Sequence, residues 1–139
     1  MLSVSALLVF VHVVANLVWI GSIIASAVAL VTPGVALDTR GTVAFQVYRR
    51  VAAPAFGLSF VTGLLRLALD TQYFLVTTKY MHGKLLFALA VIALHHVIGA
   101  RAKRAAAPES KDPGNVAVLC AGLLVCATAA AFLVLLKPF

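Results

Sequence analysis

Four stretches of mostly apolar residues constrain the fold of this chain more than any other feature. They cover residues 2–31, 51–69, 80–100 and 115–136 of a 139-residue sequence. A hydrocarbon core of about 30 Å is crossed by roughly twenty helical residues, so each stretch is about long enough to span a membrane. Neither strand-like alternation, a phosphate-binding glycine loop nor an internal repeat is visible. The sequence therefore predicts an all-α membrane protein, a single-domain bundle of four transmembrane helices.

Composition agrees with that prediction. Apolar residues make up 63% of the chain and charged residues 11%, and the mean hydropathy is +1.09. Soluble domains are about half apolar and about a quarter charged. The first stretch could instead be a secretory signal, with Ala25-Ser26-Ala27 as its cleavage site. A signal has a basic start and a short apolar core, whereas no Lys or Arg precedes Arg40 here and the apolar run is long, so we interpret the stretch as a retained span.

The net charge is +7, and most of the basic residues lie at one side of the predicted bundle. The connections between spans one and two and between spans three and four hold Arg40, Arg49, Arg50, Arg101, Lys103, Arg104 and Lys111. The positive-inside rule places both connections in the cytoplasm and both chain ends outside. Anionic lipid headgroups account for this charge, so membrane lipid rather than nucleic acid is the expected partner. Cys120 and Cys126 are about 9 Å apart on one helix, too far for a disulfide, and are interpreted as apolar fillers.

Ionisable groups within the spans call for a functional explanation, because their desolvation must be offset by a partner. His12, Asn16 and Trp19 are spaced i, i+4, i+7 and share one stripe of the first span, which predicts that they face other helices. His12 is then either a structural histidine bonded across helices or a cofactor ligand. Both interpretations stay open from the residues alone.

The third span carries two polar stripes. At about 100° per residue, His82 and His96 share one face and Lys84 and His95 another, which predicts a central position in the bundle. The predicted topology gives an outer and an inner group of polar residues. The outer group is Arg66, His82, Lys84 and Lys137, with His12 deeper, and the inner group is Arg49, Arg50, His95, His96 and Arg101.

Histidines on facing helices commonly ligate haem iron, and Phe56 and Phe87 offer apolar walls for a porphyrin. Copper(I) is the weaker alternative, because the chain has few sulfur ligands. His12 lies about 15 Å below the outer end of its span, whereas His82 lies close to that end. Shared ligation by both requires the third span to begin near Val76, or the first span to sit higher. Otherwise His12 is the only histidine that ligates the iron, and the opposite axial position is either taken by Lys84 or left open.

Four segments together resemble a known family. They are HVVANLVW at 12–19, YRRVAAPAFGLSFVTGL at 48–64, MHGKLLFALAVIALHH at 81–96 and KPF at 137–139. In order and spacing they resemble the bacterial HemJ-type protoporphyrinogen IX oxidases, which are four-helix membrane proteins related to CopD-like copper-resistance domains. Two marks of that family differ here. The segment after the first span lacks its basic and aromatic residues, and Asn115 is followed by Val116 rather than by an acid.

The resemblance implies an oxidase of the bacterial inner (plasma) membrane. Its substrate is protoporphyrinogen IX, which loses six electrons and six protons to become protoporphyrin IX in haem biosynthesis. It also implies bound haem b, with His12 as an iron ligand and Lys84 needed for activity. A neutral Lys84 amine would accept a proton, with His82 as the alternative base or second axial ligand. Electrons would pass from the haem to a membrane carrier, for which a quinone is the candidate.

Basic residues are expected to hold the porphyrin carboxylates. Arg66 is the better clamp because it is nearer Lys84, and Asn16 and Trp19 complete the predicted cofactor site. Arg49 and Arg50 match the family segment but lie towards the cytoplasmic side, as loop anchors or as a second site.

Three functions are compatible with the sequence: the oxidase, a non-catalytic b-type haem protein or electron-transfer subunit, and a copper-handling protein. A homo-oligomer is compatible too, since Gly57, Gly63, Gly83 and Gly122 permit close helix approach.

Overall fold

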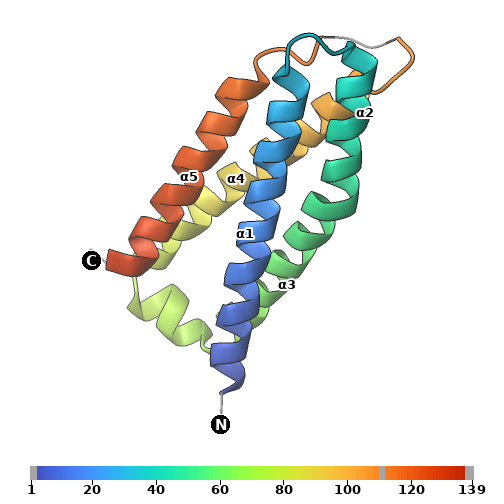
Figure 1. Ribbon diagram of the computed structural model, residues 1–139. Coiled ribbons are helices and arrows are strands. Elements are labelled where there is room, and N and C mark those ends of the chain that lie inside the picture. The colour runs from blue at the N-terminus through green and yellow to red at the C-terminus, as the bar shows by residue number, and fades with distance from the viewer. Residues whose placement is uncertain (1–2, 110–111, 137–139) are drawn as a thin grey trace.

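A computed structural model describes residues 3–109 and 112–136, and over this part of the chain the ordered elements are helices, without a strand. Five are α-helices and two are short π-helical segments, η1 and η2 (Figure 1). In chain order they are α1 (Val4–Val31), α2 (Leu37–Val47), η1 (Tyr48–Ala52), α3 (Ala53–Leu69), η2 (Gln72–Thr77), α4 (Tyr80–Ala105) and α5 (Val116–Leu136). The predicted all-α class is confirmed.

Four helical segments are long and apolar enough to cross a membrane, as the sequence predicts. They are α1, the continuous α2–η1–α3 helix over Leu37–Leu69, α4 and α5. The second span differs from the prediction, because its helix begins at Leu37 and not at residue 51. Gly41 and Ala44 are buried in its early turns, so packing extends the helix beyond the apolar stretch. Arg40, Arg49 and Arg50 therefore lie on this helix and not in a connection.

The helices run up and down, so that both basic ends meet. The α1–α2 and α4–α5 connections lie at one end of the bundle, whereas α1 begins and α5 ends towards the other (Figure 1). Gly34 and Gly114 adopt positive φ in these two connections. Arg101 donates a 2.6 Å hydrogen bond to the Pro113 carbonyl and so ties α4 to the second connection. Which end faces the cytoplasm stays a prediction from the basic residues.

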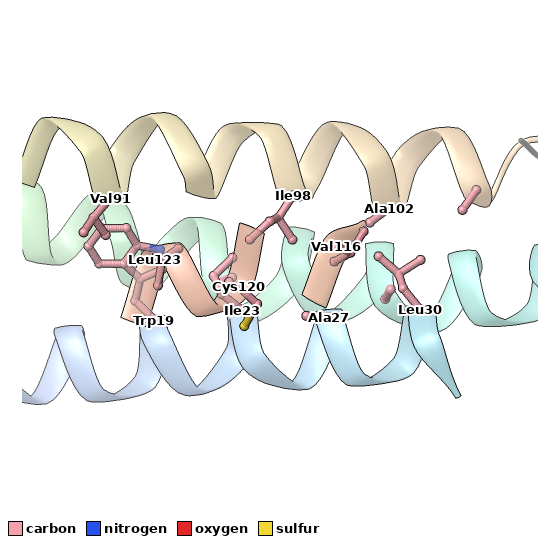
Figure 2. Packing of buried hydrophobic residues seen from close by; sticks show 13 residues of the cluster. Trp19, Ile23, Ala27, Leu30, Val91, Ile98, Ala102, Val116, Cys120 and Leu123 are labelled. Carbon is pink, nitrogen blue, oxygen red and sulfur yellow. The ribbon is translucent and has the colours of Figure 1, made fainter. Parts of the chain in front are cut away.

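The core lies mainly in the half of the bundle nearest the two connections. There α1 packs along the α2–η1–α3 helix, α4 packs along α5, and α2 also contacts α4. Figure 2 shows the buried residues of this core, of which it labels Trp19, Ile23, Ala27, Leu30, Val91, Ile98, Ala102, Val116, Cys120 and Leu123. A smaller cluster of Phe74, Tyr80 and Met81 joins η2 to the start of α4 at the other end. Apolar side chains such as Leu17 and Leu86 point outward, as a lipid-facing surface requires.

Two glycines allow the closest helix contacts. A Cβ on Gly41 would overlap the backbone of Ala105 and Ala106 at the end of α4. A Cβ on Gly99 would overlap the ring of Tyr48, which lies across α4 at this point. The α2–α4 contact therefore depends on the missing side chain at Gly41, and the η1–α4 contact on the missing side chain at Gly99.

We predict that Gly41→Ala destabilises the bundle. Its Cβ meets backbone that cannot rotate away, so the helices must separate, and overpacking of this kind costs about 1–3 kcal/mol. Gly57→Ala is the matched control, because a Cβ at Gly57 meets no atom within 4 Å. Thermal unfolding in detergent should show a lower Tm for Gly41→Ala and an unchanged or higher Tm for Gly57→Ala. Equal Tm values for the two variants would contradict the packing described here.

Candidate functional site

His12 of α1 is held by α3 in one ring orientation. Its Nδ1 lies 2.8 Å from the carbonyl oxygen of Ser59. A carbonyl can only accept, so Nδ1 carries the proton and Nε2 keeps its lone pair. The nearby Thr62 hydroxyl donates to the Leu58 carbonyl at 2.7 Å and is left to accept. Within the described residues Nε2 has no hydrogen bond, so His12 presents one unused basic nitrogen.

The surroundings of His12 fix this geometry further. A Cβ added to Gly63 would lie 3.0 Å from His12 Cε1, so the imidazole packs directly over the glycine. Asn16 donates from Nδ2 to the His12 carbonyl at 2.9 Å, and its Oδ1 accepts from the Ser59 hydroxyl at 3.0 Å. Asn16 thus links α1 to α3 beside the imidazole. The predicted stripe of His12 and Asn16 does face another helix.

Three of the predicted site residues, His12, Arg66 and Lys84, lie in the half of the bundle away from the basic connections. Lys84, half-buried near the start of α4, is close enough to both His12 and Arg66 for their charges to interact. Arg66 places its guanidinium 4.7 Å from the ring centroid of Phe74, which is buried in η2. A cation over an aromatic face is attracted by the ring quadrupole. The three basic side chains therefore come from three different spans, α1, α3 and α4.

The charge of this cluster is positive. Four carboxylates occur in the sequence, and three of them, Asp38, Glu109 and Asp112, lie in or beside the two connections at the opposite end. Asp70 follows α3 and accepts a hydrogen bond from the Tyr73 amide at 3.1 Å. The group formed by His12, Arg66 and Lys84 is thus suited to an anionic ligand, which carboxylates on a lipophilic molecule would supply.

His82, the other histidine of the predicted ligand pair, lies in the first turn of α4. Its side chain is exposed, and in the described parts of the chain no side-chain hydrogen bond or ring contact joins it to His12. The helix α4 begins at Tyr80 and not near Val76, so the condition for shared ligation is not met on that side. Lys137, Lys111 and the closing KPF segment lie outside the described residues.

Trp19 and His95 form a buried network with Tyr48 that was not among the predicted sites. The Trp19 indole donates to His95 Nδ1 at 2.9 Å, and His95 Nε2 lies 3.2 Å from the Tyr48 hydroxyl. An indole N–H can only donate, so the neutral His95 ring carries its proton on Nε2 and donates it to Tyr48. Both ring nitrogens are used, and the His95 side chain is fully buried. His95 is a structural histidine, and Trp19 contacts this network and not the His12 ring.

One part of this network was indicated by the sequence, because the stripe shared by His12 and Trp19 predicts that Trp19 faces another helix. Seven residues separate them by nearly two turns, so they face the same side at different depths. The Tyr48 contact depends on the π-helical turn η1 and on Gly99, and neither feature is visible as a sequence pattern. Arg49 and Arg50 follow on the same turn and are exposed.

The donor set and the comparisons with known proteins complete the description. No group of three or more His, Cys, Asp or Glu residues that could hold a metal ion exists in residues 3–109 and 112–136. Cys120 and Cys126 are free thiols. No family model, no curated protein and no solved structure matched the chain in the comparisons.

We predict that Trp19→Phe destabilises the fold by leaving His95 Nδ1 buried without a donor. An unsatisfied buried polar group costs about 1–3 kcal/mol. In a His95→Leu background no acceptor remains, so the same Trp19→Phe change should cost less. Unfolding of the two single variants and the double variant in detergent gives the coupling free energy. Strictly additive effects would show that the hydrogen bond does not stabilise the fold.

Proposed function

We propose that this chain is a haem-b-binding membrane oxidase of the HemJ type, which converts protoporphyrinogen IX to protoporphyrin IX. The observation that carries the proposal is the state of His12. Its Nδ1–H is held by the Ser59 carbonyl, and its Nε2 is left as an unbonded base inside a membrane span. Imidazoles that ligate metals are commonly oriented by such a bond from the second nitrogen. The proposed location is the bacterial inner membrane.

The donor set fits haem better than a bare metal ion. A porphyrin supplies four nitrogens to its iron, so one or two protein ligands suffice. His12 meets that need, whereas copper would need a fuller set of protein donors than these residues provide. Gly63 leaves room for the His12 ring and fixes its height along α3. When bound, haem supplies one-electron redox chemistry.

Lys84 and Arg66 are proposed to act on the substrate. Lys84 on α4 and Arg66 on α3 lie within electrostatic range of each other. Their positive charges would attract the carboxylates of the substrate. A lysine in a low-dielectric site is readily neutral, and a neutral Nζ accepts a proton as the substrate is oxidised. Arg66 stays charged and is held by Phe74, so it is the better group to bind a carboxylate.

A non-catalytic b-type haem protein is the second candidate. Two sequence observations favour it: the apolar segment after the first span, and Val116 in the place where the family has an acid. The same His12 geometry would serve such a protein. Turnover separates the two candidates.

We expect the protein purified in detergent after expression with ample haem to show a Soret band and reduced b-type bands. His12→Ala should lose them, since the iron ligand is gone. His82→Ala, an exposed control on α4, should keep them. A colourless wild-type protein, or equal spectra for wild type and His12→Ala, would contradict haem ligation by His12.

Lys84→Met should retain the haem spectrum and lose at least tenfold in the rate of protoporphyrinogen oxidation. Methionine keeps the chain length and removes the amine. Lys79→Met is the matched control, because Lys79 is exposed before α4. Turnover is followed by porphyrin fluorescence. Haem binding without turnover by the wild type would favour the non-catalytic candidate.

A further inference from the structure

His96 is a polar side chain on the outer surface of a membrane span. It follows the buried His95 on α4, yet its own side chain is exposed. No hydrogen bond among residues 3–109 and 112–136 engages either of its ring nitrogens. The adjacent His95 cannot help, because both of its nitrogens are already bonded to Trp19 and Tyr48. His96 is thus a hydrogen-bonding group without a hydrogen-bond partner in the part of the chain that the structure describes.

The depth of His96 makes this costly. Nine residues separate it from the end of α4 at Ala105, or about 13 Å along the helix. The predicted third span ends at about residue 100, four residues beyond His96, so His96 lies about 6 Å inside that end of the span. Polar groups at such depth are expensive unless a ligand or another group satisfies them.

Aromatic rings line the surface beside His96. Phe56 of α3 meets the His96 ring edge to face at a centroid distance of 5.7 Å. Phe60, one turn further on, lies 5.9 Å from Phe56 and is exposed. The α3 and α4 helices thus place a hydrogen-bonding imidazole beside Phe56, which is partly buried against the core, with the exposed Phe60 next to it on α3. A flat, apolar ring with a carbonyl oxygen fits this arrangement, since it stacks on the phenyl groups and accepts from the imidazole.

We propose that His96, Phe56 and Phe60 form a binding site for the head group of a membrane quinone. The inference extends the proposed oxidase function by placing its electron acceptor. Protoporphyrinogen IX and three quinones give protoporphyrin IX and three quinols, so six electrons and six protons are transferred and balanced. His96 donates a hydrogen bond to a quinone carbonyl. The tail remains in the lipid beside α3.

Trp19 provides a direct probe of this site. It is the only tryptophan of the chain, and its ring centroid lies 4.9 Å from that of Phe56. Quinones quench indole fluorescence at short range. The full chain in lipid nanodiscs is titrated with a benzoquinone that carries a ten-carbon tail, and Trp19 emission is followed. We expect saturable quenching in the wild type.

His96→Leu should raise the Kd for the quinone at least tenfold, because the variant loses the hydrogen bond that the exposed imidazole donates to the quinone carbonyl. His96→Gln, which keeps a donor, should recover most of the affinity. His82→Leu, another exposed histidine on α4, should leave the Kd unchanged. Equal titrations for wild type and His96→Leu, a matching loss in His82→Leu, or no saturation in the wild type would each overturn the site.

The test is independent of haem ligation. The titration is repeated with His12→Ala, in which the proposed iron ligand is absent. Quinone binding that persists there supports the site even if the haem spectrum fails. A haem spectrum with no quinone binding would leave the proposed oxidase in place and remove His96 as its acceptor site.

Discussion

The structure depends on one constraint: polar groups inside the hydrocarbon must be satisfied by the protein itself. The backbone meets it by forming helices over almost all of the described residues. Side chains meet it by bonds to backbone of their own or a neighbouring helix, as Ser26 does with the carbonyls of Ser22 and Ala44. Histidine is the instructive case. A neutral imidazole has one N–H and one unprotonated nitrogen, so a histidine in a span can have both nitrogens, one or neither bonded to the protein.

The three membrane histidines described in detail divide along this line. His95 is closed, with a donor on one side and an acceptor on the other. His12 is half open, since only Nδ1 is engaged by its neighbour. Neither ring nitrogen of His96 has a hydrogen bond within the described residues. The neighbouring positions 95 and 96 therefore differ completely, because one helical step of about 100° turns the second ring from the core to the lipid.

Much of the fold was predictable from the sequence, and less of the site. The number and approximate position of the spans follow from apolar run length, which needs no knowledge of packing. The early start of the second span does not, because Gly41 is helical there through contact with α4. His12, Lys84 and Arg66 were predicted as site residues, and the structure places Lys84 within electrostatic range of the other two. The role of His95 was missed, since helical periodicity gives the face of a residue but not the partner opposite it.

The π-helical turn η1 can be explained by the insertion of one residue during evolution. The amide of Ala53 bonds to the carbonyl of Tyr48, five residues back, so this turn holds one residue more than an α-helical turn would. An extra residue in a continuous helix rotates everything beyond it by about 100° relative to what precedes it. The α2 face that meets α4 and the α3 face that meets His12 are thus set independently within one span. A single inserted codon is enough to produce such an arrangement. A relative that is one residue shorter at this turn would keep the helix. It would lose either the contact of Tyr48 with α4 or the contact of His12 with α3.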